Sequence, residues 1–190
     1  MPSDPELVLR ALSIHQTPLN LGTILRTEIP EEILIAALAR AESDDAETDL
    51  MYSLAKRGSV AALPEIVKRL DHDDPVLRSY AADAIGDIAA TCHQNGQSVG
   101  PEFGQALYDR YTPDAPDVYL TAMAAASHTP VIPLLIDALA SDSASTRRSA
   151  AWGLGYLGAA EAKTVLTAAL AHETDPGTKE MLEWACEQMK

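Results

Sequence analysis

The sequence predicts an all-α fold, an α-α superhelix of about five helical pairs, and three observations support this prediction. Residues 63–89 repeat at residues 132–158 in one register and with no gap. The chain has 47% hydrophobic but only 5% aromatic residues, which suits a core of Ala, Leu, Ile and Val between closely packed helices. No alternating β-branched run flanked by turns indicates a strand. A fixed internal period is typical of stacked repeat arrays, whose units pack against their neighbours.

The N-terminal helices are expected to begin at capping residues. Asp4 or Ser3 is placed to cap a first helix that has Pro5 at its first position. A second short helix is expected over residues 18–26, and another begins at Pro30.

Later helices are expected to begin at residues that suit a first turn, and residues 93–100 form the one evident loop insertion. Of these starting residues, Asp73, Asp114, Asp142 and Asp175 are expected to accept hydrogen bonds from free amides. The expected starts are Asp44 or Asp45, Ser59, Asp73 or Asp74, Pro101, Asp114, Thr129, Asp142, Ala159 and Asp175.

The two clear copies match residue by residue at an offset of 69. The thirteen-residue spacing from Asp73 to Gly86 also recurs from Asp45 to Gly58, whereas the unit beginning at Asp114 has Ser127 at that place. The first-copy residues that are identical in the second copy include Pro64, Leu70, Asp73, Arg78, Ala81, Ala82 and Gly86.

This pattern resembles the HEAT-repeat family, in the short form known from phycobilisome-lyase-type repeats. The resemblance rests on residues 73–88 and 142–158 and extends over residues 45–190. It implies a concave side lined by the second helix of each unit, and an arginine ladder in which Arg78 and Arg147 meet Asp residues. We therefore predict one HEAT-like repeat domain over residues 1–190, with a divergent N-terminal cap over 1–43 and recognisable repeats over 44–190.

The net charge of −14 bears on the choice of partner. Nucleic acid is not expected, because phosphate backbones are bound by Lys and Arg, and this chain has 14 of these against 28 acidic residues. The acidic excess has two interpretations. It keeps exposed helix faces solvated, or it forms a docking surface for a basic protein.

Membrane insertion and export are not expected from the sequence. No run reaches the roughly 18 to 20 apolar residues of a membrane span, and the N-terminus lacks the pattern of a signal peptide. Cys92 and Cys186 are far apart and lack a metal-type spacing, so a reduced, cytoplasmic setting is the plain interpretation.

No catalytic or metal constellation is predicted, and no cofactor is expected. The chain has a single His-Glu pair, His172-Glu173, whereas di-iron hydroxylases built from HEAT repeats have such a pair in several repeats. Gly153, Gly155 and Gly158 match a dinucleotide fingerprint only formally, because they fall within an expected helix rather than between a strand and a helix.

The candidate partner-binding residues come from two groups. Trp152 and Tyr156 replace Asp83 and Asp87 of the first copy, so a polar stripe becomes aromatic. Trp and Tyr are frequent in binding hot spots, although packing against a neighbouring unit is the alternative. The second group comprises polar residues of the expected second helices, namely Glu65, Lys68, Arg69, Gln105, Asp109, Asp137 and Lys163.

The functional hypothesis is a non-enzymatic protein-interaction module that binds another protein through its curved helical surface. It would act as an adaptor, an assembly factor, or an inhibitor or immunity protein for a basic partner. The alternative, which follows from the family resemblance, is a bilin lyase or chromophore-handling subunit.

Overall fold

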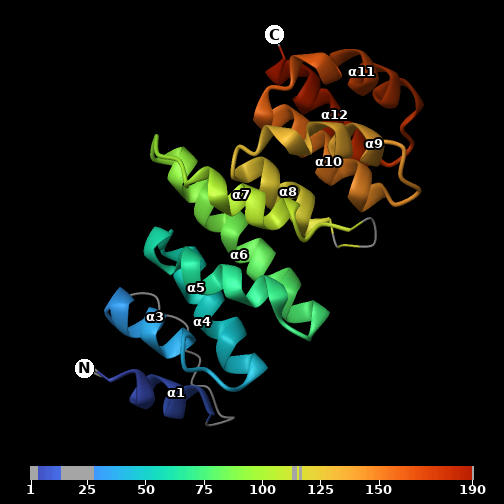
Figure 1. The fold of residues 1–190 in the computed structure, drawn as a ribbon. Coiled ribbons are helices and arrows are strands. Elements are labelled where there is room, and N and C mark those ends of the chain that lie inside the picture. Colours follow the sequence, from blue (N-terminus) through green and yellow to red (C-terminus); the bar gives the residue numbers. More distant parts are fainter. Residues whose placement is uncertain (1–3, 14–27, 113–114, 116, 190) are drawn as a thin grey trace. The chain divides into compact units, whose positions relative to one another are not determined.

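The computed structural model describes residues 4–13, 28–112, 115 and 117–189, and every regular element within these ranges is a helix (Figure 1). This confirms the all-α prediction. The chain packs as two compact units, Met1–Val99 and Gly100–Lys190. The predictions that concern the helix over residues 18–26 and the cap at Asp114 lie outside the described residues.

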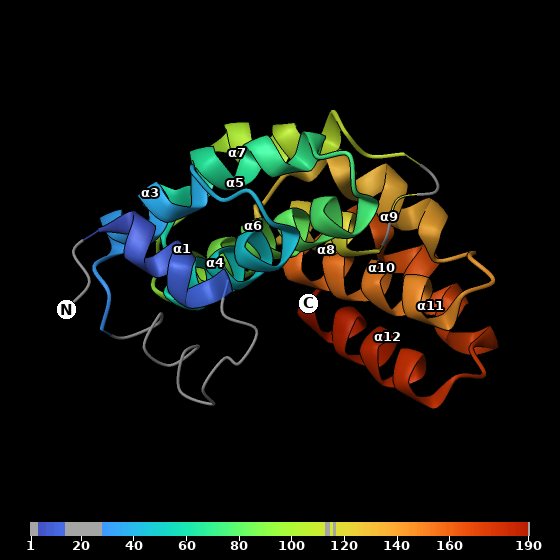
Figure 2. The same cartoon turned by 90° about the horizontal axis from the view of Figure 1, so that it is seen from below.

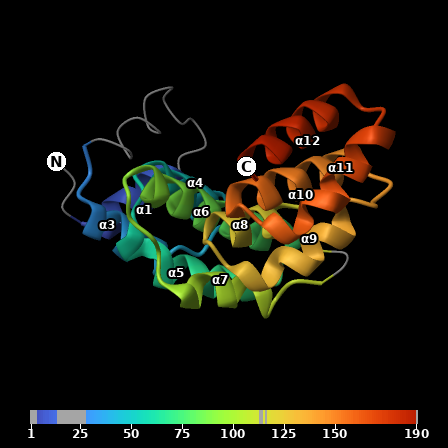
Figure 3. The same ribbon diagram turned by 90° about the horizontal axis from the view of Figure 1, so that it is seen from above.

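The first unit packs short helices against longer ones. Helix α3 packs on α4, α5 packs on α6, and α4 lies alongside α6, while α1 contacts both α3 and α4 (Figure 3). Its helices are α1 (Pro5–Ser13), α3 (Glu31–Leu38), α4 (Asp44–Lys56), η1 (Val60–Ala62), α5 (Leu63–Lys68), η2 (Arg69–Asp71) and α6 (Pro75–Gln94). The core between them is aliphatic, with Leu34, Leu50, Leu54, Ile66 and Ile85 fully buried.

The second unit repeats this arrangement. Helix α7 packs on α8, α9 on α10, and α11 on α12, and α10 lies between α8 and α12 (Figure 2). Its helices are α7 (Pro101–Tyr108), α8 (Val118–Ala125), η3 (Thr129–Val131), α9 (Ile132–Ala138), α10 (Ala144–Leu157), η4 (Ala160–Ala162), α11 (Lys163–His172) and α12 (Pro176–Gln188).

The described residues form five helical pairs, which confirms the expected number of about five. The pairs begin at a different helix from the one that we expected. We expected Glu65 and Asp137 to lie in the second helix of a unit. Their helices, α5 and α9, instead pack most closely on the helices that follow them, α6 and α10. In the described residues the shorter helix is therefore the first member of each pair, except that α7 and α8 both have eight residues.

Two long helices end in the same way, with a left-handed glycine, and this corrects which glycine of the other repeats Gly58 corresponds to. Gly58 and Gly158 have positive φ angles of 65° and 59°, and each ends a long helix. The next amide, of Ser59 or Ala159, donates to a carbonyl five residues back. Gly58 thus corresponds to Gly158, not to Gly155 as the thirteen-residue spacing suggested. Ser127 occupies the same left-handed position after α8, with φ of 56°.

The helix starts confirm some predicted caps and correct others. The side chains of Asp4 and Asp175 accept from the amides of Glu6 and Thr178 at 2.9 and 2.8 Å, as expected. The predicted caps Asp73 and Asp142 are wrong by one residue. The neighbouring side chains of Asp74 and Ser143 accept these hydrogen bonds instead, because they have the extended backbone of a cap.

Two further details concern α6 and α10. Helix α6 runs to Gln94, so it takes the first two residues of the expected loop insertion at 93–100. Gly155 lies within α10 where α12 crosses, and a Cβ there would lie 2.6 Å from the Trp184 ring and 2.9 Å from the Ala185 Cα. This agrees with the expected close approach of neighbouring helices.

Candidate interaction surface

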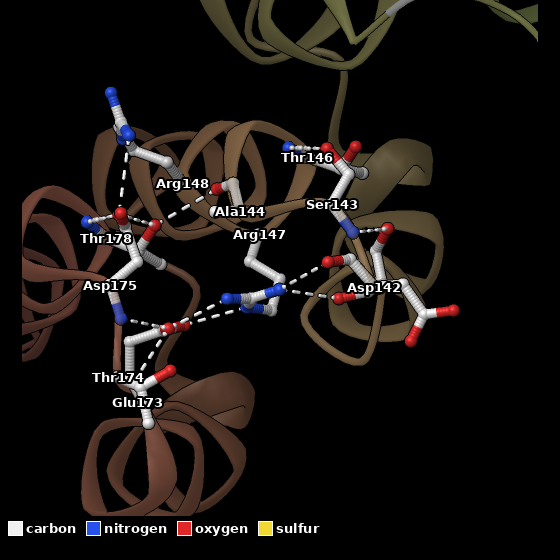
Figure 4. Close-up of polar contacts among 11 residues, drawn as sticks. Asp142, Ser143, Ala144, Thr146, Arg147, Arg148, Glu173, Thr174, Asp175 and Thr178 are labelled. Atoms are coloured by element: carbon white, nitrogen blue, oxygen red, sulfur yellow. Dashed lines mark hydrogen bonds and ion pairs between the residues drawn. The ribbon is translucent and has the colours of Figure 1, made fainter.

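The recurring arginine of the repeats holds the turn before its own helix. The Nη1 group of Arg147 donates to the carbonyls of Ser141 and Asp142 at 2.9 and 3.0 Å (Figure 4). Arg78 does the same in the first unit, donating to His72 and Asp73 at 2.7 and 2.9 Å. The matched position therefore has one structural role in both copies, since its guanidinium satisfies two carbonyls of the turn that precedes its helix.

Arg147 also joins its repeat to the next one, through a glutamate rather than the expected Asp. Its Nε and Nη2 groups donate to Glu173 at 2.7 and 2.8 Å, which makes a two-pronged ion pair (Figure 4). Glu173 also accepts from the amides of Thr174 and Asp175, each at 2.9 Å. These bonds, the one from Arg147 first, lower the pKa of Glu173 to about 2. Glu173 is therefore ionised at neutral pH, and its hydrogen bonds hold the two repeats together.

The first unit has the same kind of link with its charges exchanged. Glu47 occupies the helix position in α4 that Arg147 occupies in α10, four residues after the cap. Arg69, at the end of α5, donates to Glu47 at 3.2 Å and also to the backbone carbonyl of Leu38. Both charged side chains are about 10% exposed, so the pair lies in the interior. Arg69 was a candidate partner-binding residue, and its burial removes it from the surface.

The other polar candidates lie on or beside the short helices, mostly paired with one another. Lys68 is exposed and bonds Glu65 at 2.6 Å, and Gln105 donates to Asp109 at 2.6 Å. Lys163 is exposed and donates to the Met189 carbonyl at 3.3 Å.

Asp137 borders a shallow hollow of about 560 Å³ beside α9. The hollow also includes Ile132, Ile136 and Glu161, so it combines an apolar floor with acidic residues.

Trp152 and Tyr156 form a stacked pair on α10. Their ring centroids lie 4.8 Å apart at an interplanar angle of 30°. Both side chains are half-buried, so one part of the stack packs inside the unit while another part remains accessible. Aromatic pairs of this geometry bury a large apolar area and are frequent in protein interfaces.

The structure adds a surface that we did not predict as a binding site, here called the α4–α6 face. Its residues recur at helical spacing on two adjacent helices, a signal that the sequence alone contains but that only the packing of α4 beside α6 makes meaningful. They are Asp45, Asp49, Tyr52 and Lys56 of α4, and Val76, Tyr80, Asp83 and Asp87 of α6.

Lys56 connects the two halves of the α4–α6 face. Its ammonium group bonds Asp87 at 2.6 Å and lies 5.3 Å from the centre of the Tyr52 ring. The bond with Asp87 raises the pKa of Lys56, so the lysine is charged at neutral pH. Desolvation and the neighbouring Asp87 carboxylate raise the pKa of Asp83.

Within the described ranges, no group of three or more His, Cys, Asp or Glu side chains could hold a metal ion. None of the helices in the described part of the chain is both long and apolar enough to cross a membrane.

The comparison with protein families agrees with the repeat pattern. Residues 100–187 match the family model of HEAT repeats, a range that coincides with nearly all of the second unit. This confirms the resemblance to HEAT repeats there. No protein of curated function matches the sequence.

Among solved structures, an engineered protein from the Northeast Structural Genomics Consortium is similar with a TM-score of 0.53 and 16% identity, over 97% of this chain and 96% of that chain. This likeness supports the HEAT-like helical-repeat fold.

Two enzymes are more distantly similar. The complex of CpcE and CpcF of phycocyanin lyase from Nostoc sp. PCC7120 has a TM-score of 0.49 and 17% identity, over 98% of this chain and 94% of that chain. Human deoxyhypusine hydroxylase in complex with glycerol has a TM-score of 0.38 and 17% identity, over 97% and 95%.

Proposed function

We propose that this protein is a non-enzymatic interaction module that binds a partner protein through exposed faces of its helices. The observation that supports this most directly is the half-buried Trp152–Tyr156 stack on α10, part of which remains accessible. HEAT-like arrays expose extended surfaces without needing a pocket for chemistry, and Trp and Tyr are the side chains that contribute most to such interfaces.

The remaining candidate residues would supply polar contacts to the partner. Five of them belong to or border α5, α7 and α9, and a sixth begins α11. Polar residues at the rim of an interface contribute more to the choice of partner than to the strength of binding, and we assign these side chains that role. The six are Glu65, Lys68, Gln105, Asp109, Asp137 and Lys163.

The test compares capture by the wild-type protein with capture by the double variant Trp152→Ala/Tyr156→Ala. Each is immobilised and exposed to lysate of the native host, and the retained proteins are identified by mass spectrometry. We expect one stoichiometric protein on the wild type and a loss of at least about tenfold on the variant, as for a hot-spot truncation. The control is Val165→Ala, a truncation of an exposed side chain on α11.

The outcomes are distinct. Equal retention by all three proteins would refute a role for the Trp152–Tyr156 stack. Retention of a coloured species, with visible absorbance that survives purification, would favour the bilin-handling alternative over a plain interaction module. Folding of each variant is checked first by circular dichroism and thermal unfolding.

A further inference from the structure

We propose that the α4–α6 face is the docking surface for a segment of the partner protein that is rich in lysine or arginine. This inference rests on the proposed function and names the chemistry of the partner. The α4–α6 face is a pair of adjacent helix stripes within the first unit, whereas the Trp152–Tyr156 stack belongs to α10 of the second unit.

The first argument is the exposure of large side chains. Tyr52, Val76 and Tyr80 are 52%, 57% and 47% exposed, and they account for three of the seven large apolar side chains exposed in the described residues. All three belong to the two stripes of this face. Single exposed apolar residues need no explanation, but their concentration on one face is typical of interaction sites.

The second argument is the charge that surrounds these side chains. The two stripes contribute four carboxylates, from Asp45, Asp49, Asp83 and Asp87, and a single ammonium group, from Lys56. The pKa of Asp49 is raised by desolvation and by the neighbouring Asp45, and that of Asp83 by desolvation and Asp87. The two carboxylates of each stripe therefore repel each other, and a partner's cations would relieve that repulsion.

The third argument is that the face already binds one cation. Lys56 bonds the Asp87 carboxylate at 2.6 Å while its ammonium lies over the Tyr52 ring at 5.3 Å. This combination of carboxylate and aromatic ring is the arrangement that recognises a lysine or arginine side chain. Tyr80 lies three residues before Asp83, so a second ring and carboxylate share a side of α6.

Charge also argues against a second copy of this chain as the occupant. A symmetric contact would place two copies of the four-carboxylate face together, within proteins of net charge −14. Like charges opposed across an interface are unfavourable. A basic segment of another protein satisfies both the exposed rings and the carboxylates.

The test titrates isotope-labelled protein with a short lysine-rich peptide and follows the backbone amides by NMR. We expect shifts concentrated on α4 and α6, and their loss when every lysine of the peptide is acetylated. Asp45→Asn/Asp49→Asn should weaken binding about tenfold, and Tyr80→Ala should weaken it several-fold.

The matched control is Glu180→Gln/Glu183→Gln, which removes the same two charges from exposed positions on α12. We expect this variant to change affinity less than about twofold, at equal salt concentration. Equal weakening by both double variants, or shifts scattered over the whole surface, would overturn the inference and indicate only non-specific attraction.

The same variants separate this inference from the proposed function. If Asp45→Asn/Asp49→Asn retains the captured partner as well as wild type while Trp152→Ala/Tyr156→Ala loses it, the inference is wrong and the proposed function stands. If the captured partner is lost with Asp45→Asn/Asp49→Asn but kept with Glu180→Gln/Glu183→Gln, both stand.

Discussion

The carboxylate of Glu173 shows how one residue can join two repeats. It accepts from the Arg147 guanidinium and from the amides of Thr174 and Asp175, and its side chain is only 3% exposed. These donors stabilise its ionised form, which is why its pKa lies at about 2 rather than at 4.5. Its role is structural, because both carboxylate oxygens are engaged by Arg147 and by backbone amides rather than left open for a metal ion beside His172.

Acid titration tests this role. A carboxylate with a lowered pKa contributes stability that is complete above its ordinary pKa of 4.5 and is lost as the pH falls toward 2. We expect Glu173→Gln to lower the melting temperature at pH 7 and to show a smaller further loss across this acid range than wild type. The control is Glu180→Gln, an exposed glutamate on α12. Acid unfolding curves of Glu173→Gln that parallel wild type would contradict the assignment.

Residue-level roles were only partly predictable. The sequence identified Arg78 and Arg147 as equivalent, and the structure gives them the same two backbone acceptors. It did not identify Arg69 as buried, because its acceptors on Leu38 and Glu47 lie 31 and 22 residues away. Pairs at such separations are decided by packing, not by local pattern.

At the scale of an element, the end of α8 departs from the ends of α4 and α10. Ser127 adopts a left-handed backbone with φ of 56°, where the other two helices have Gly58 and Gly158. A residue with a Cβ pays about 1 kcal/mol for this conformation. Sequence reasoning noticed the serine, but only the structure shows that its position is the helix end.

Substitution at this end should therefore stabilise the protein. We expect Ser127→Gly to raise the free energy of unfolding by about 0.5–1 kcal/mol, measured by urea denaturation. The opposite sign is expected for Ser149→Gly within α10, where glycine costs about 1 kcal/mol in a helix interior. A destabilising Ser127→Gly would show that the serine side chain has a role that outweighs the backbone strain.

The crossing of α10 and α12 gives a second test at this scale. A Cβ on Gly155 would lie 2.9 Å from the Ala185 Cα, which is backbone and cannot yield without moving α12. We expect Gly155→Ala to lower the free energy of unfolding by about 1–3 kcal/mol.

Gly177→Ala is the matched control, because the nearest atoms to its Cβ, at 3.3 Å, belong to the flexible end of Arg148. It should change stability by less than about 0.5 kcal/mol. Similar losses in Gly155→Ala and Gly177→Ala, measured by thermal unfolding, would rule out the helix crossing as the cause.

At the scale of the whole molecule, the excess of acidic residues should affect stability as well as binding. With 28 acidic and 14 basic residues, the folded chain concentrates negative charge that the unfolded chain can spread apart. The family match covers residues 100–187, whereas the most acidic stretch lies in the first fifty residues. The single repeat domain over residues 1–190 stays a prediction.

Salt should therefore stabilise the protein. We expect the melting temperature to rise by several degrees when sodium chloride is increased from about 10 mM to about 150 mM, since the Debye length falls from about 30 Å to about 8 Å. Glu180→Gln/Glu183→Gln should show a smaller rise, because two charges are removed. A melting temperature that falls or stays constant with salt would mean that ion pairs such as Lys56–Asp87 outweigh the overall repulsion.

The sequence by itself determined the all-α repeat fold, the equivalence of residues 63–89 and 132–158, and helix starts such as Asp4 and Asp175. These features depend on periodicity and on hydrogen bonds between residues a few positions apart. Only the tertiary structure decided that Arg69 is interior and that Lys56 meets Asp87 across 31 residues. Such contacts depend on how neighbouring helices align, and one sequence does not reveal that alignment.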